Sequence, residues 1–342
     1  MGCELGQIAA MTLSPDAPAL AVEDLSIRFA GSPADTVAGL RFQVSRGETL
    51  CIVGESGCGK SLTALALMGL LPPAARVGGG RILVQGQDVL AMGERARADL
   101  RGDTIAMVFQ EPMSSLNPVL TIGAQIAEAV LRHRGGTHAR ASARALDMLR
   151  LVSIPAPEQR LASYPHQLSG GMRQRAMIAM ALVNDPAVLV ADEPTTALDV
   201  TIQAQILALV ARLQGEAGTA LALITHDLGV VAEVADRVAV MYAGRIVETG
   251  PVAAVFDDPL HPYTIGLMGS VPSLGRRAGR LATIDGTVPP PHAMPPGCRF
   301  ATRCPFADRR CQAEPPPVVE AAPGHSAACW KAPLEAALAL AG

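Results

Sequence analysis

Short apolar runs recur through the first 250 residues, and patterns typical of helices separate several of them. The runs lie at about 20–22, 50–53, 81–84, 105–110, 188–192, 220–225 and 238–242. Runs of this length are typical of strands buried in a sheet, and their alternation with helices predicts an α/β domain with a largely parallel core sheet. In such a sheet the ligand lies beyond the carboxyl ends of the strands.

The pattern changes twice along the chain. From 112 onward it becomes helical, with candidate helices at 122–131 and 139–151, which predicts a helical subdomain inserted in the main domain. After about 256, proline-rich pieces surround a group of cysteines and indicate a small irregular unit. We therefore divide the chain into a disordered start, a main domain, its inserted helical subdomain and an irregular C-terminal region, at 1–18, 19–255, 112–185 and 256–342.

The composition narrows the class of protein. Of the 342 residues, 49% are hydrophobic but only 3% are aromatic. No apolar run reaches the roughly 18 residues that a membrane-spanning helix needs. The first residues contain neither a basic region nor a long apolar segment, so we expect no signal peptide and a cytosolic protein. The formal net charge of −3 argues against nucleic acid as a partner.

One segment, between a strand-like run and a helix-forming run, is suited to binding phosphates. It consists of Gly54, Glu55, Ser56, Gly57, Cys58, Gly59, Lys60 and Ser61, followed by Leu62. Its glycines allow backbone conformations that turn successive N–H groups toward one anion, and Lys60 adds a positive charge. In such loops the lysine reaches the β- and γ-phosphates of a nucleotide, and the hydroxyl at the position of Ser61 ligates Mg²⁺. The alternative is a glycine-rich turn that caps a helix, with a solvated lysine.

Two adjacent carboxylates follow the apolar run at 188–191. Asp192 and Glu193 therefore stand at the carboxyl end of a predicted buried strand. We expect Asp192 to hold Mg²⁺ through water and Glu193 to orient or deprotonate the attacking water. The alternative is an acidic pair that opens a loop before Pro194.

A second glycine-containing segment, 168–175, opens another predicted helix. Ser169 is followed by Gly170 and Gly171, and this can be a simple helix cap with a permissive backbone. The same exposed N–H groups, hydroxyl and positive helix end also suit a γ-phosphate. Because the first segment already binds one nucleotide, this second surface is suited to a ligand held by another chain.

Together these residues resemble the ATP-binding subunits of ABC transporters. The resemblance implies an α/β ABC-type P-loop ATPase domain over 19–255 and gives roles to residues that are uninformative alone. Gln110 resembles the glutamine that contacts Mg²⁺ and senses the membrane subunits, and His226 resembles the switch histidine at the γ-phosphate. The signature motif that contacts the partner's nucleotide corresponds to Ser169, Gly170, Gly171 and Gln174, the D-loop aspartate to Asp199, and the aromatic residue that stacks on adenine to Phe29.

Within this family, the chain is similar to one branch, the ATPases of dipeptide and oligopeptide importers, and to the first of their two paired ATPases. The segments 164–175, 109–118 and 261–263 carry this similarity, which covers about 20–330. Met172 and Arg173 depart from the commonest form of the signature motif but fit this branch.

The resemblance also implies partners and a location. These are ATP and Mg²⁺, a second ABC ATPase subunit in a head-to-tail pair, two transmembrane permease subunits and an extracytoplasmic solute-binding protein, at the cytoplasmic face of the plasma membrane. An alternative is a soluble ABC ATPase that acts as a switch in translation or DNA repair. The single phosphate loop, and the lack of a heptad run or basic tail, argue against this alternative. A redox-regulated sensor is a third interpretation.

Four of the seven cysteines lie near the C-terminus: Cys298, Cys304, Cys311 and Cys329. Their spacings of 5, 6 and 17 intervening residues differ from those of common zinc modules. In a reducing compartment, clustered thiols hold metal more readily than they form disulfides, and four thiolates suit an iron–sulfur cluster. Zinc or unliganded thiols remain open on spacing alone. The resemblance to the peptide-importer ATPases implies a [4Fe-4S] cluster.

Overall fold

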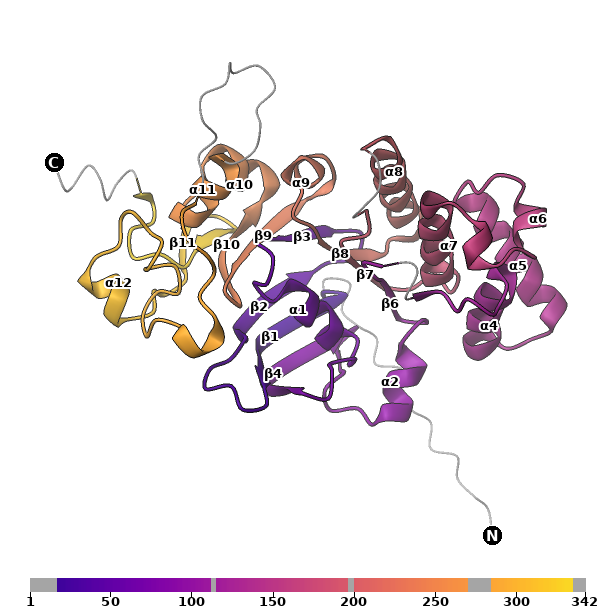
Figure 1. Cartoon of the computed structure of the whole chain (residues 1–342), viewed down its shortest axis with the longest axis horizontal. Helices are drawn as coiled ribbons and strands as arrows, with labels where there is room; N and C mark the ends of the chain where they lie inside the picture. The colour runs from indigo at the N-terminus through magenta and orange to yellow at the C-terminus, as the bar shows by residue number, and fades with distance from the viewer. Residues whose placement is uncertain (1–16, 112–114, 196–199, 270–283, 335–342) are drawn as a thin grey trace, which may run out of the picture.

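A large mixed sheet forms the centre of the computed structural model, which describes residues 17–111, 115–195, 200–269 and 284–334 (Figure 1). Its strands are β3 (Thr49–Val53), β6 (Ile105–Val108), β7 (Val188–Asp192), β8 (Ala220–Ile224), β9 (Arg237–Tyr242), β10 (Arg245–Pro251), β11 (Val319–Ala322) and β12 (His325–Ala327). Their order is β11-β12-β10-β9-β3-β8-β7-β6. The strands from β9 to β6 pair in parallel, whereas β10, β12 and β11 pair antiparallel. The predicted α/β fold with a parallel core sheet is confirmed.

A smaller antiparallel sheet lies beside the first (Figure 1). It has the order β2-β1-β4-β5, with strands β1 (Leu20–Phe29), β2 (Val37–Val44), β4 (Ala75–Val84) and β5 (Gln87–Asp88). Buried residues of β1, β2 and β4 share one core with those of the helix α1 (Lys60–Leu67) and one face of the large sheet. The short helix α2 (Glu94–Leu100) ends in this core at the buried Leu100.

Successive residues of the parallel strands enter two different cores. On β3, Leu50 and Ile52 belong to the core shared with the small sheet, whereas Cys51 and Val53 belong to a second core on the opposite face. Side chains alternate between the two faces of a strand, so both faces of the large sheet are covered. This explains why the parallel strands are continuously apolar in the sequence.

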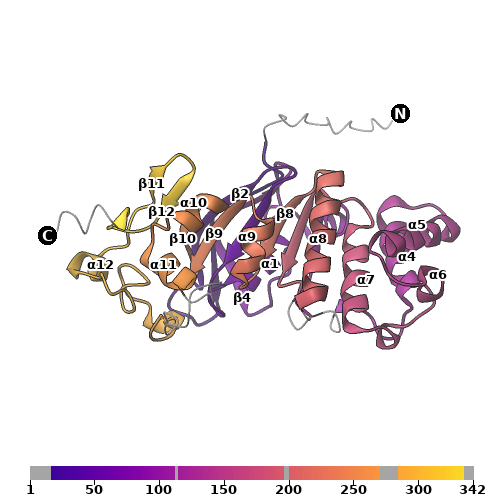
Figure 2. The same cartoon turned by 90° about the horizontal axis from the view of Figure 1, so that it is seen from above.

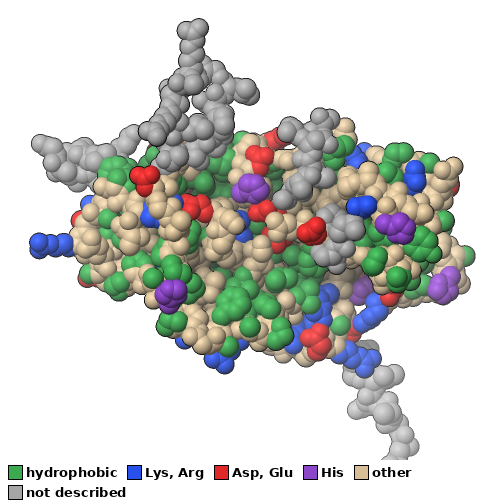
Figure 3. All heavy atoms as spheres, in the orientation of Figure 1, with side chains coloured by type: hydrophobic (Ala, Val, Ile, Leu, Met, Phe, Trp, Pro, Cys, Tyr) green, Lys and Arg blue, Asp and Glu red, His purple; other side chains and the backbone are tan. Residues whose placement is uncertain are grey.

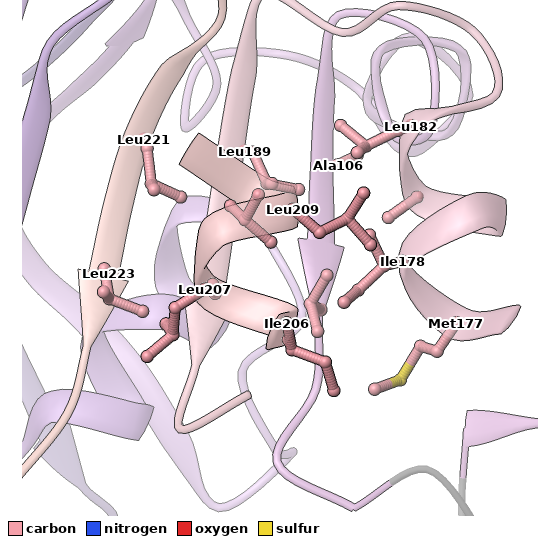
Figure 4. Packing of buried hydrophobic residues seen from close by; sticks show 14 of the residues in the cluster. Ala106, Met177, Ile178, Leu182, Leu189, Ile206, Leu207, Leu209, Leu221 and Leu223 are labelled. Carbon is pink, nitrogen blue, oxygen red and sulfur yellow. The ribbon is translucent and has the colours of Figure 1, made fainter. Parts of the chain in front are cut away.

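Helices cover the second face of the large sheet. Figure 4 shows Leu207 and Leu209 of α8 (Val200–Ala217) beside Leu223 of β8 and Leu189 of β7, all in one cluster of buried residues. The helix α9 (Leu228–Val234) contributes to the same cluster. This packing fixes the carboxyl ends of β7 and β8, which carry the candidate catalytic residues.

The predicted helical subdomain projects to one side of the sheet (Figures 1 and 2). It contains α4 (Ile122–Arg134), α5 (His138–Leu151), α6 (Pro157–Arg160), the 3₁₀ helix η1 (Pro165–Gln167) and α7 (Gly170–Leu182). The side chains of Thr121 and Thr137 accept hydrogen bonds from the first turns of α4 and α5 and so cap these helices. Both candidate helices are confirmed.

The C-terminal unit, which we define as residues 284–334, lies at the other end of the molecule (Figures 1 and 2). It follows α10 (Val252–Asp257) and α11 (Pro262–Gly269), and it contains η2 (Pro291–Ala293), α12 (Arg309–Ala313), β11 and β12. Its strand β12 pairs with β10, so the unit extends the main sheet. The sequence pattern did not predict this pairing. Among the described residues, none of the helices has the length and apolar character to cross a membrane.

Candidate active site

The phosphate loop, residues 54–61, connects β3 to α1. Gly54 has a φ of +153°, and a Cβ added there would lie 2.1 Å from the carbonyl oxygen of Met241 on the neighbouring strand β9. A larger residue therefore cannot occupy this position without moving the loop. Gly59 caps α1 with a φ of +105°, in the left-handed region that favours glycine.

Lys60 is directed into the loop. Its side chain is buried at 5% exposure, and its ammonium group donates hydrogen bonds to the carbonyl oxygens of Gly54 (2.8 Å) and Glu55 (3.0 Å). The solvated lysine of the alternative interpretation is therefore not found. Cys58 is buried beside Lys60, and burial raises the pKa of its thiol. Ser56 and Gly57 are exposed, and Leu62 packs on the core shared with the small sheet.

Two of the predicted Mg²⁺ ligands are in contact. The hydroxyl of Ser61 donates a 3.1 Å hydrogen bond to the Asp192 carboxylate at the end of β7. Asp192 is buried, and this burial raises the pKa of its carboxyl group above the usual value. A cation bound here would favour the ionised carboxylate, and hydroxyl and carboxylate oxygens are ligands that Mg²⁺ accepts. These residues therefore fit the metal.

Glu193 contacts the other two predicted catalytic residues, Gln110 and His226. Its carboxylate accepts a 3.1 Å hydrogen bond from the amide of Gln110, which follows β6. Its other oxygen lies 3.2 Å from Nδ1 of His226, which follows β8. The Glu193 backbone has a φ of +45°, a conformation that is uncommon for a residue with a side chain and is often found at functional sites.

The site therefore lies where the parallel strands β3, β6, β7 and β8 end, as predicted for this class of sheet. Figure 3 shows acidic side chains and a histidine gathered near the middle of the corresponding face. These groups approach one another because neighbouring parallel strands end at the same edge.

The signature segment occupies a separate surface. Ser169 caps α7 and accepts a 3.4 Å hydrogen bond from the Met172 N–H, and Ser169 and Gly170 are exposed. Figures 1 and 2 show α7, a helix of the helical subdomain, away from α1. Gln174 differs from its neighbours because it is buried at 1% exposure, so its side chain faces the interior of this chain.

Two predicted residues remain, the candidate aromatic for adenine stacking and the candidate D-loop aspartate. Phe29 ends β1 and is half-buried against the core shared with the small sheet. Asp199 lies outside the described residues.

The predicted iron–sulfur cluster is wrong. Among the described residues, which include all four C-terminal cysteines, no group of three or more His, Cys, Asp or Glu side chains is arranged to hold a metal ion. Burial raises the pKa of all four thiols, that of Cys304 to about 11. None of the four forms a disulfide bond.

Sequence reasoning missed the contacts that the C-terminal unit and the helix α11 make with the phosphate loop. Arg303 pairs with Glu55 at 2.9 Å, and the hydroxyl of Tyr263 accepts a 2.9 Å hydrogen bond from the Glu55 N–H. A cavity of about 420 Å³ lies between the loop and residues 286–291. Tyr263 stands in a segment that the resemblance had marked, but no pattern in the sequence indicated Arg303.

Comparisons with known proteins agree with this geometry. The family "ABC transporter" matches residues 37–196, and the family "Oligopeptide/dipeptide transporter, C-terminal region" matches residues 247–311. The chain is 55% identical to a probable peptide ABC transporter ATP-binding protein, y4tR, of Sinorhizobium fredii. It is 51% identical to the dipeptide transport ATP-binding protein DppD of Bacillus subtilis. Each match covers 91% of this chain and 94% of the relative.

A solved structure supports the assignment. The dimeric structure of MJ0796, a bacterial ABC transporter cassette, matches with a TM-score of 0.61 and 26% identity, over 68% of this chain and 98% of that one. A post-hydrolysis state of the same cassette, bound to ADP and Pi, matches equally well. The chain therefore belongs to the ATP-binding proteins of ABC transporters, in the branch that carries the oligopeptide/dipeptide transporter C-terminal region.

Proposed function

We propose that this chain binds MgATP jointly with a second ABC ATPase subunit and hydrolyses it to power the import of dipeptides, oligopeptides or related solutes. The observation that carries the proposal is the assembly of Lys60, Ser61, Asp192, Glu193 and His226 at one edge of the parallel sheet. This set combines a phosphate-binding loop, ligands for a divalent cation and a carboxylate for the attacking water.

In this mechanism the phosphate loop receives the triphosphate. Its N–H groups, the N-terminus of α1 and Lys60 offset the phosphate charge, and Ser61, Asp192 and Gln110 would hold Mg²⁺. When bound, Mg²⁺ would supply charge stabilisation to the phosphate oxygens. Lys60 exchanges its two backbone carbonyl partners for phosphate oxygens.

Glu193 then acts on the water that attacks the γ-phosphate. A general base must lie within hydrogen-bond reach of the proton it accepts, and a positioned base is worth about 10²–10⁴ in rate. Gln110 and His226 contact the Glu193 carboxylate and hold it in one orientation. His226 is exposed and can also contact the γ-phosphate.

The second nucleotide-binding surface of this chain contacts the nucleotide held by the facing subunit. Ser169, Gly170 and Gly171 lie at the start of α7 on a surface separate from the phosphate loop, which suits a contact made with nucleotide held by a partner. The solved cassette MJ0796 is dimeric, which supports this arrangement. Binding of ATP then closes the pair, and hydrolysis reopens it.

Coupling to transport requires subunits that this chain does not contain. We propose two transmembrane permeases, a solute-binding protein on the outside, and a peripheral location of this chain at the cytoplasmic face of the membrane. The names of the relatives, which are peptide or dipeptide transport proteins, support peptides as the solute class. The match of the C-terminal region favours the importer over a soluble ATPase switch.

The substitution Glu193→Gln tests the catalytic assignment. The variant should bind ATP with wild-type affinity but hydrolyse it about 10²–10⁴-fold more slowly, because it lacks the base. Nucleotide binding by calorimetry and phosphate release should be measured on the same preparation. Hydrolysis at the wild-type rate would refute the role of Glu193.

A further inference from the structure

Arg303 lies in the C-terminal unit, yet its side chain is directed at the phosphate loop. The side chain is buried at 5% exposure. Its guanidinium donates to both oxygens of the Glu55 carboxylate, at 3.1 and 2.9 Å. It also donates to the carbonyl oxygens of Ile284 and Asp285, at 3.1 and 2.8 Å, and lies 3.4 Å from the Tyr242 hydroxyl. The guanidinium is therefore held in one place by several partners.

Glu55 is fixed at each of its polar groups. Its carboxylate pairs with Arg303, its N–H donates to the Tyr263 hydroxyl, and its carbonyl oxygen accepts from Lys60. A continuous chain of contacts thus runs from Arg303 through Glu55 to the lysine of the phosphate loop. The aromatic ring of Tyr242 packs against that of Tyr263, with ring centroids 4.7 Å apart, and supports the same contacts.

The charge of Glu55 poses a physical problem for the loop. A carboxylate stands within the segment that receives a triphosphate, and like charges repel. The Glu55 side chain is only 29% exposed, so solvent screens this repulsion less than it would at an open surface. A paired guanidinium removes the repulsion because it offsets the carboxylate charge at close range.

From this geometry, we infer that Arg303 is a positioning residue of the nucleotide site that neutralises the Glu55 carboxylate and thereby sets the affinity of the phosphate loop for ATP. The C-terminal unit then contributes directly to nucleotide binding. This inference rests on the proposed function, because it assumes that the loop binds ATP. It assigns Arg303 no contact with the nucleotide.

The test measures MgATP binding by calorimetry with the full-length chain, in the Glu193→Gln background so that nucleotide is not consumed. Arg303→Gln leaves the Glu55 charge unpaired, and the dissociation constant should rise about tenfold. The double variant Arg303→Gln/Glu55→Gln lacks both charges and should recover most of the lost affinity. Glu55→Gln alone should bind ATP more tightly than Arg303→Gln, because it removes the carboxylate that repels the phosphates. Steady-state hydrolysis by Arg303→Gln in the wild-type background should show a raised KM with little change in kcat.

Lys331→Gln provides a matched control. It removes the 2.8 Å ion pair between Lys331 and Asp308, which belongs to the same C-terminal unit but does not contact the phosphate loop. Its ATP affinity should equal that of the unsubstituted chain. Arg303→Lys keeps a positive charge and should retain affinity better than Arg303→Gln, which guards against a variant that merely folds poorly.

Three results would overturn the inference: wild-type affinity in Arg303→Gln, a defect that Glu55→Gln does not reverse, or a Glu55→Gln variant that binds as weakly as Arg303→Gln. These results differ from a failure of the proposed function. In that case the Glu193→Gln chain would bind no ATP before any further substitution is made.

Discussion

The phosphate loop and the C-terminal unit contact each other but are built differently. In the loop, backbone geometry places the functional groups, since Gly54 approaches β9 too closely for any side chain and the catalytic residues end neighbouring strands. At the C-terminal unit, side chains make the connections, through Arg303 of the unit, Tyr263 of the preceding helix α11 and a buried cluster around Glu248 of β10. The loop places its functional groups through backbone geometry, which the local sequence determines. The other contacts depend on side chains that come from positions far apart in the chain.

The strongest perturbation of the loop should come from Lys60→Ala. It removes a charge-assisted contact to phosphate worth about 1.5–3 kcal/mol, so the dissociation constant for ATP should rise about 10–150-fold. Calorimetry with MgATP measures this effect. Unfolding by urea should show that the variant remains folded, and unchanged ATP affinity would exclude Lys60 from the site.

In the C-terminal half of the chain, substitution of Glu248 should lower the free energy of unfolding strongly. Its carboxylate is buried on β10 and accepts hydrogen bonds from the N–H groups of Leu260 (2.8 Å) and His261 (2.9 Å), and it lies 2.8 Å from Nε2 of His325 on β12. Glu248→Gln presents an amide to some of these donors and should lower the free energy of unfolding by about 2–3 kcal/mol.

Urea unfolding of Glu248→Gln should be compared with that of Glu320→Gln. Glu320 is an exposed residue of β11 that accepts one hydrogen bond from Gly324, and its substitution should cost less than about 0.5 kcal/mol. Equal stability of the two variants would show that the buried cluster does not tie β12 to the main sheet.

The stability of this region should also depend on pH. Burial lowers the pKa of His261 from 6.5 to about 3, and its Nδ1 accepts a hydrogen bond from the Tyr263 N–H, which requires the neutral ring. The unfolded chain therefore binds a proton that the folded chain does not between these two values. The stabilisation is complete above pH 6.5 and is lost as the pH falls toward 3, by up to about 1.4 kcal/mol per pH unit.

This pH effect can be measured by urea unfolding at several pH values between about 7 and 5, with His261→Asn as the reference. Asparagine supplies an acceptor oxygen but does not titrate in this range, so the variant should show a shallower loss of stability. An identical pH dependence in both proteins would contradict the role of His261.

The smallest effect is expected at the cysteines. Cys329→Ala removes a half-buried thiol that accepts a weak 3.4 Å contact from the Lys331 N–H. Because the structure assigns it no metal, stability should change by less than about 1 kcal/mol and ATP hydrolysis by less than about twofold. Stoichiometric iron in the purified protein, or loss of folding in this variant, would contradict the assignment of free thiols.

The contrast between backbone geometry and side-chain contacts explains which features of the fold could be predicted from the sequence. Asp192 and Glu193 stand at the end of a strand whose five residues are all buried, and this local pattern suffices to put them at the carboxyl edge of the sheet. The strand β12 has only three residues, one of them the buried His325, and no periodicity marks it. Its pairing with β10 depends on side chains that become neighbours only in the folded chain.

Two residues show that a sequence motif does not predict where a side chain lies in the folded chain. Gln174 belongs by motif to an exposed surface, but the turn of α7 directs its side chain into the core. Arg303 belongs to no motif, and its partner Glu55 lies 248 positions earlier in the chain. A local pattern identifies the chemistry of a residue but cannot predict which distant side chain it meets.

The central claim is that ATP is bound between two facing subunits. Sedimentation velocity should be measured for the Glu193→Gln chain, alone and mixed with the second ATPase subunit of its transporter, with and without MgATP. The account predicts a pair that forms only with MgATP and is abolished by Lys60→Ala. Pairing that is independent of nucleotide, or a chain that binds no ATP, would contradict it.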